Sequence, residues 1–156
     1  MNLNKLKETN QNITLIRCVA ILLVLFYHLD IALFKNGFLG VDIFFVVSGY
    51  VITLSLLKRE KKNNFVFNFF VSRLDRLLPP ILATVIFSIF LSWFFLNPDL
   101  MRLFGQGIFS SLIFLSNFYF FLTIDYFAYN ADLQPLIHMW SLAVEFQFYL
   151  IYPILY

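Results

Sequence analysis

Five long apolar segments, separated by short polar linkers, make up most of the chain. They cover residues 13–34, 38–57, 81–96, 103–124 and 140–156. A helix needs about 20 mostly apolar residues to cross the hydrocarbon core of a bilayer. The third segment reaches this length when residues 77–80 enter the interface, and the sequence stops within the fifth. The pattern therefore predicts an all-α fold, a polytopic transmembrane helix bundle with about four complete spans and a truncated fifth.

Composition supports membrane residence. Hydrophobic residues make up 61% of the chain and charged residues 13%, with 22 Phe, whereas a soluble domain carries about 25% charged residues. Disorder is excluded because it requires low hydrophobicity and high charge. Cys18 is the single cysteine, which excludes an intrachain disulfide and a cysteine-based zinc site. A net charge of +2 is too small to indicate nucleic-acid binding.

Eight of the eleven basic residues lie in two places and predict the orientation. Some precede the first segment and others follow the second: Lys5, Lys7, Lys58, Arg59, Lys61, Lys62, Arg73 and Arg76. The positive-inside rule places the N-terminus and the 58–76 linker in the cytoplasm. A cleaved signal peptide is the alternative for residues 13–34, but Arg17 interrupts the apolar run and no small-residue cleavage site follows. We therefore expect a retained helix.

The 125–139 linker fits this orientation poorly. Simple alternation of four spans returns it to the cytoplasm, yet it contains Asp125 and Asp132 and no Lys or Arg. Acidic residues contribute little to the orientation rule, so the conflict is weak. A re-entrant element, or a segment that does not cross, is the alternative.

Two ionisable residues in the first segment are candidates for chemistry. Arg17 and His28 are eleven residues apart, which places them within about 20° on one helix face and roughly 16 Å apart along the axis. Each costs roughly 2.5–3.5 kcal/mol to insert, and histidine titrates near neutrality. Two plainer interpretations stay open. In the first, the Arg17 side chain extends to the interface. In the second, His28 is a neutral packing residue bonded to a neighbouring helix.

A second set of charges lies outside the first segment. Arg73 and Arg76 are three residues apart, hence neighbours on one face of a helix. They form either a guanidinium pair for a phosphorylated ligand or a basic flank that contacts anionic lipid. Glu145 lies in an apolar run and needs a partner, for which Arg17 and His28 are candidates.

Four further polar positions have structural interpretations. Asp42 begins the second segment, where the helix dipole favours an anion. Ser48–Gly49 lies at mid-span, where small residues allow helices to approach closely. His138 and Trp140 begin the fifth segment, as interfacial residues do.

Four stretches in register carry a family resemblance. They are the Arg17–His28 pair, GFLGVDIFFVVSGYVI at 37–52, FFVSRLDRLLPP at 69–80 and HMWSLAVEFQFYLIYP at 138–153. Together they resemble the N-terminal half of membrane acyltransferases of the acyltransferase-3 family, which includes bacterial sugar O-acetylases. Two departures stand out. The family's Glu-Glu-Gln reads Glu145–Phe146–Gln147 here, and family members have more spans, so residues 1–156 are expected to be an incomplete acyltransferase domain.

The resemblance implies transfer of an acetyl or similar acyl group from cytoplasmic acyl-CoA, such as acetyl-CoA, to a cell-surface carbohydrate hydroxyl, such as that of an O-antigen sugar. The location implied is the bacterial inner (cytoplasmic) membrane, and no metal or redox cofactor is required. The missing C-terminal half of the bundle is the further partner. The catalytic residues implied are His28, Arg17 and Glu145. The donor-binding residues are Arg73 and Arg76, and those supporting the site are Asp42, Ser48, His138 and Trp140.

Two other classes of function stay open. A polytopic transporter or proton relay also places ionisable residues inside a helical bundle. The second alternative is a non-catalytic truncated fragment.

Overall fold

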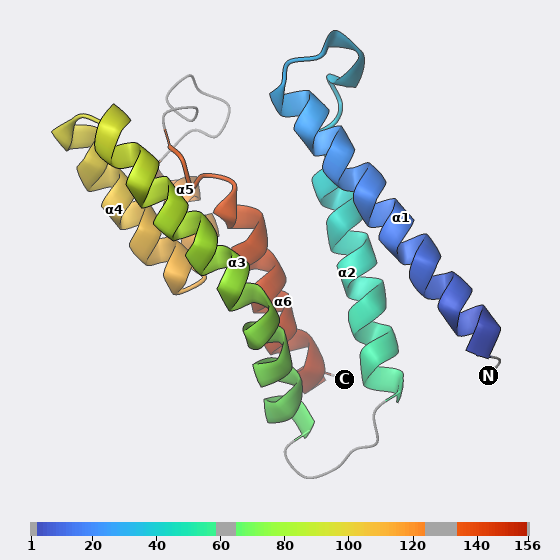
Figure 1. The fold of residues 1–156 in the computed structure, drawn as a ribbon. Helices are drawn as coiled ribbons and strands as arrows, with labels where there is room; N and C mark the ends of the chain where they lie inside the picture. Colours follow the sequence, from blue (N-terminus) through green and yellow to red (C-terminus); the bar gives the residue numbers. More distant parts are fainter. Residues whose placement is uncertain (1–2, 59–64, 124–133, 156) are drawn as a thin grey trace. The chain divides into compact units, whose positions relative to one another are not determined.

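The fold is known from a computed structural model that describes residues 3–58, 65–123 and 134–155. Every regular element in these ranges is a helix (Figure 1). The elements are α1 (Leu3–His28), the short 3₁₀ helix η1 (Ala32–Phe34), α2 (Leu39–Lys58), α3 (Phe65–Phe95), α4 (Pro98–Leu112), α5 (Ser116–Thr123) and α6 (Met139–Leu155). The predicted all-α fold class is confirmed.

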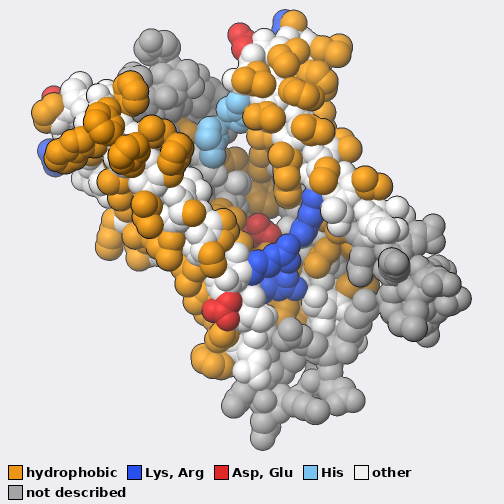
Figure 2. Space-filling view, in the orientation of Figure 1, with side chains coloured by type: hydrophobic (Ala, Val, Ile, Leu, Met, Phe, Trp, Pro, Cys, Tyr) orange, Lys and Arg blue, Asp and Glu red, His pale blue; other side chains and the backbone are white. Residues whose placement is uncertain are grey.

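Three helices of the described chain are long and apolar enough to cross a membrane. The apolar stretches are Gln11–His28 in α1, Leu39–Leu57 in α2 and Val66–Phe95 in α3, and α6 is a shorter apolar helix. Hydrophobic side chains cover much of the visible surface (Figure 2). Phe95 and Phe121 are 81% and 83% exposed. Such a surface suits a hydrocarbon solvent, and the chain is a multi-pass membrane protein.

The chain forms two compact units, and α1 with α2 make up the first, residues Met1–Glu60. The predicted first segment, 13–34, is wrong at its end because α1 stops at His28. Asp30 adopts a left-handed conformation with φ 52°, which Asp tolerates better than most residues because its short side chain bonds locally. This residue turns the chain toward η1 and back into α2.

Two glycines allow α2 to pack directly on the backbone of α1. A Cβ atom built on Gly40 would lie 2.5 Å from the carbonyl oxygen of Ala20, and one on Gly37 would overlap the carbonyl of Leu23. Ala20 is completely buried at this contact. Small residues at such positions let helices associate by close packing.

The second unit, residues Lys61–Tyr156, is built on α3. With 31 residues, α3 is roughly 46 Å long, more than the 30 Å of a bilayer core. The predicted third segment began at residue 81, but the helix extends back to Phe65 and continues through Pro79 and Pro80. Because proline has no N–H, these two residues remove backbone hydrogen bonds near the middle of α3.

The core of the second unit lies where α6 packs on α3. Its buried members come from α3, α4, α5, α6 and the flanking turns: Ile81, Val85, Phe104, Phe114, Phe120, Leu136, Ile137, Ala143 and Phe146. The Phe146 ring stacks on Phe114, with centroids 3.7 Å apart and planes at 12°, and also contacts Phe70 at 5.3 Å. Phenylalanine therefore supplies much of the packing between these helices.

The single span predicted over 103–124 is wrong, because the chain breaks after α4 and turns back. Phe114 has φ 56°, and α5 begins at Ser116. The α5 ring of Phe120 packs over Gly107 of α4, and the Tyr119 hydroxyl lies 3.2 Å from Gln106 Oε1. The two helices therefore form a hairpin, visible in Figure 1. The hydropathy of residues 103–124 does not reveal this break, because the break is stabilised by the stacking of Phe114 on Phe146, a residue far away in the sequence.

The glycine contacts generate a stability prediction. Gly40→Ala should lower the stability of the α1–α2 pair by about 1–3 kcal/mol, the usual cost of overpacking, because the new methyl group meets backbone that cannot rotate away. Gly49→Ala is the matched control, since a Cβ there meets no described heavy atom within 4 Å and Ala is the better helix former. The apparent unfolding temperature and membrane yield of the whole protein measure both. Equal stability of the two variants would contradict the close packing.

Candidate active site

Arg17 and His28 both lie on α1, which is continuous between them. Arg17 is half-buried, and its Nε atom is buried with no hydrogen-bond partner among the described residues. A buried polar atom normally has a partner, so this guanidinium is suited to receive one from a ligand or another segment.

His28 is the last residue of α1 and is exposed. Its Nδ1 atom lies 2.7 Å from the carbonyl oxygen of Val24. Because a carbonyl only accepts, Nδ1 carries the hydrogen, and the lone pair of the neutral ring lies on Nε2. The imidazole also packs edge-to-face with the ring of Tyr27, with the two centroids 5.2 Å apart, and this contact helps to orient it. The ring is thus held with a basic nitrogen pointing away from its own helix.

The α2 candidates differ in burial. Asp42 is exposed in the first turn of α2, and Ser48 is buried. The neighbouring Gly49 is not a point of close approach, because a Cβ there would meet no described atom. Close approach to the backbone of α1 is instead made by Gly37 and Gly40, about two to three turns earlier.

Arg73 and Arg76 lie on α3 near its first end, but their surroundings differ. The Arg73 guanidinium lies over the rings of Phe69 and Tyr149, at 5.1 and 5.7 Å from the centroids. Arg76 is exposed. Aromatic faces attract a guanidinium and fix its plane, so Arg73 is oriented, whereas Arg76 extends into the surroundings.

Glu145 accepts a hydrogen bond from the Tyr149 hydroxyl one turn later on α6. Tyr149 is buried, and its ring also contacts Arg73, so the three side chains form a connected group between α3 and α6. Sequence reasoning missed Tyr149, although its position four residues after Glu145 is the signal for a neighbour on one helix face. The predicted pairing of Glu145 with Arg17 or His28 joins the two units and stays a prediction.

His138 and Trp140 lie where α6 begins. His138 is exposed, and its backbone carbonyl accepts a hydrogen bond of 3.1 Å from Ser141 Oγ. Trp140 is half-buried and packs against the core of the second unit. Sequence reasoning assigned no role to Gln147, whose side-chain amide bonds both Asn117 and the Phe114 carbonyl.

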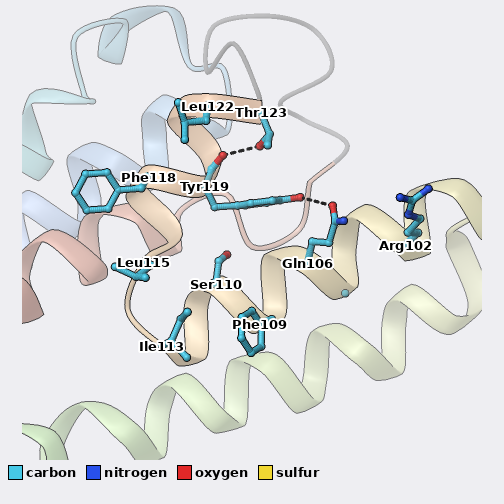
Figure 3. A pocket seen from close by; sticks show the side chains of 11 residues that line it. Arg102, Gln106, Phe109, Ser110, Ile113, Leu115, Phe118, Tyr119, Leu122 and Thr123 are labelled. Atoms are coloured by element: carbon cyan, nitrogen blue, oxygen red, sulfur yellow. Dashed lines mark hydrogen bonds between the residues drawn. The ribbon is translucent and has the colours of Figure 1, made fainter.

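A separate open cavity of about 770 Å³ lies between α4 and α5. Figure 3 shows the Tyr119 side chain reaching toward Gln106 across it, with Arg102 further along α4. None of the candidate residues lines this cavity. Within residues 3–58, 65–123 and 134–155, no three His, Cys, Asp or Glu side chains gather as a metal site would require.

The helices and their ionisable residues define a multi-pass membrane protein with buried or oriented charges, the pattern expected of a functional site in a bilayer. A family described as an acyltransferase domain (Acyl_transf_3) matches residues 10–156. The chain belongs to this family, as its four motifs predicted.

Two curated relatives illustrate the similarity. The chain is 38% identical over 141 residues to the peptidoglycan O-acetyltransferase OatA of Listeria monocytogenes, an alignment covering 88% of the chain and 22% of the relative. It is 34% identical over 142 residues to the O-acetyltransferase OatA of Staphylococcus aureus, covering 89% and 23%. The chain therefore spans less than a quarter of the length of these relatives. No solved structure matches it.

Proposed function

We propose that this chain is part of a membrane O-acyltransferase that moves an acetyl group from acyl-CoA to a carbohydrate hydroxyl of the cell envelope. The observation that carries the proposal is the family match over residues 10–156 in a chain whose first span holds both Arg17 and an oriented His28. The bacterial cytoplasmic membrane, with the N-terminus inside, is the proposed location because basic residues gather at the start of α1 and between α2 and α3.

The chemistry requires a basic nitrogen near the acceptor. The sugar hydroxyl oxygen forms an ester bond to the acyl carbon, the thioester carbon–sulfur bond breaks, and the hydroxyl proton ends on the leaving sulfur. His28 either relays this proton or carries the acyl group between the two substrates. Both roles use the lone pair on Nε2, which the Nδ1 bond to Val24 favours. Arg17 supplies a fixed cation on the same helix to bind or orient an anionic group.

The donor-binding residues proposed are Arg73 and Arg76. Both lie near the end of α3 that follows the basic 58–64 linker, where cytoplasmic CoA would arrive. The CoA phosphates match guanidinium groups in charge and shape. Glu145 would act through its contact with Tyr149, whose ring lies against Arg73.

The acceptor proposed is a peptidoglycan sugar hydroxyl. The expectation from the motifs was a cell-surface sugar such as that of O-antigen. A relative named as a peptidoglycan O-acetyltransferase, 38% identical to this chain, favours peptidoglycan. Acetate released from purified peptidoglycan by mild base, compared between cells with and without the gene, tests this choice. An unchanged acetate content in peptidoglycan would argue for another acceptor.

The donor site generates one prediction. In the whole protein, Arg76→Lys and Arg73→Lys should each raise the KM for acetyl-CoA about tenfold, because lysine cannot make the planar two-pronged contact with phosphate. Arg76 is exposed, so its substitution tests the ligand without disturbing packing. Arg102→Lys, on the exposed face of α4, is the control and should leave KM unchanged. If neither Arg73→Lys nor Arg76→Lys changes KM, the pair is a lipid-facing flank.

The second prediction concerns His28. His28→Ala should abolish acetylation while leaving membrane yield intact, and a role limited to proton transfer would cost roughly 10²–10⁴-fold. His28→Gln keeps the hydrogen-bonding capacity but cannot titrate near neutrality, so it should be nearly as inactive. Cys18→Ser, at an exposed position beside Arg17, is the control. Substantial activity of His28→Gln would make His28 a packing residue, and proton-coupled flux without acetylation would indicate a transporter.

A further inference from the structure

The hairpin of α4 and α5 is too short to cross a bilayer as a single span. With 15 and 8 residues, the two helices are roughly 22 Å and 12 Å long, whereas the hydrocarbon core is about 30 Å thick. α5 also returns along α4, as the contact of Phe120 with Gly107 and that of Tyr119 with Gln106 require. The chain therefore enters and leaves this segment at the same end.

The tip of the hairpin lies beside the middle of α6. Gln147, the ninth residue of α6, donates a hydrogen bond of 2.9 Å to the Phe114 carbonyl. Its amide also pairs with Asn117 at the start of α5, with two reciprocal bonds of 3.0 Å. Ser116 adds a bond of 3.0 Å to the carbonyl of Met139. A network of polar side chains thus anchors the break to α6.

The membrane makes this network necessary. Hydrocarbon offers no water to bond the backbone groups that a broken helix releases, so irregular backbone at membrane depth must be buried in protein and satisfied there. Phe114 is 6% exposed and Ser116 1% exposed, which meets the first condition. Gln147 meets the second by bonding the carbonyl at the left-handed residue.

The direction of α6 follows from its packing on α3. Figure 1 shows that the two helices run in opposite directions. Phe70 and Arg73, near the start of α3, contact Phe146 at the middle of α6 and Tyr149 in its second half. When α3 leaves the cytoplasm, α6 must return to it.

We propose that α4 and α5 form a re-entrant hairpin that opens on the outer side of the membrane, and that Gln147 is the positioning residue that holds its tip at mid-membrane. Residues 134–138, just before α6, then lie outside. The sequence agrees with this placement, because residues 125–139 contain Asp125 and Asp132 and no Lys or Arg. His138 and Trp140 begin α6 on the outer side, opposite the end of α3 that carries Arg73.

Cysteine labelling of the whole protein tests the topology. In a background in which Cys18 and every other native cysteine of the whole protein are replaced by Ser, single cysteines are placed by Asp99→Cys at the start of α4, Pro135→Cys before α6 and Asn63→Cys in the basic linker. An impermeant maleimide added to intact spheroplasts should label the first two, and Asn63→Cys only after permeabilisation. Labelling of Asp99→Cys and Pro135→Cys from opposite sides would mean a crossing span and overturn the hairpin. Labelling of both only from inside would overturn the outward opening.

A second experiment tests the role of Gln147. Gln147→Leu leaves Asn117 and the Phe114 carbonyl without their partner, so we expect a lower apparent unfolding temperature and weaker external labelling of Pro135→Cys. The exchange Asn117→Gln with Gln147→Asn conserves the combined side-chain length and should restore both. Thr84→Ala, which removes a hydrogen bond within α3 only, is the control. Failure of the exchange to rescue, or a stable Gln147→Leu variant with unchanged labelling, would overturn the positioning role.

The topology does not rest on the proposed function. Maleimide labelling can be measured in a His28→Gln variant that has lost acetylation. A loss of activity and a wrong topology are therefore detected by different measurements. An inactive protein with the expected labelling would contradict only the proposed function. An active protein with Asp99→Cys and Pro135→Cys labelled from opposite sides would contradict only the hairpin.

Discussion

Satisfaction of backbone hydrogen bonds without water is the constraint on which the second unit depends. Long apolar helices meet it by themselves, and α3 does so over 31 residues. The break at residues 113–115 cannot, and it is supported by side chains from α6: the Phe146 ring on Phe114 and the Gln147 amide on its carbonyl. Removal of either contact would expose polar backbone to hydrocarbon, so the position of α6 and the shape of the hairpin depend on each other.

The two units use different kinds of packing. In the first, glycines at 37 and 40 let the backbones of α1 and α2 approach, and the contact depends on the absence of side chains. In the second, large aromatic rings fill the space between α3, α6 and the hairpin. Membrane helices gain little hydrophobic driving force from association, so close packing and interhelical hydrogen bonds replace it. Both units use close packing, the first through glycines that have no side chain and the second through large aromatic rings.

The candidate residues fall into two groups with different physical settings. Arg17 and His28 share one helix of the first unit, with a buried guanidinium nitrogen that has no described partner and an imidazole oriented by Val24. Arg73, Tyr149 and Glu145 are connected in the second unit through an aromatic contact and a hydrogen bond. Under the proposed function, the second group would bind the donor and the first would act on the transferred group.

The order of apolar segments, the all-α class, the family and the position of Arg17 and His28 on one helix were determined by the sequence itself. Hydropathy and helix periodicity are local properties of the sequence, so they favour the same helices regardless of how the rest of the chain packs. The end of α1 and the division of residues 103–124 were decided by tertiary structure. Asp30 and Phe114 take left-handed conformations only because the chain that follows packs back on an earlier or later helix. The contact between Arg73 and Tyr149 joins residues 76 positions apart, and no local pattern predicts which rings a guanidinium will meet across two helices.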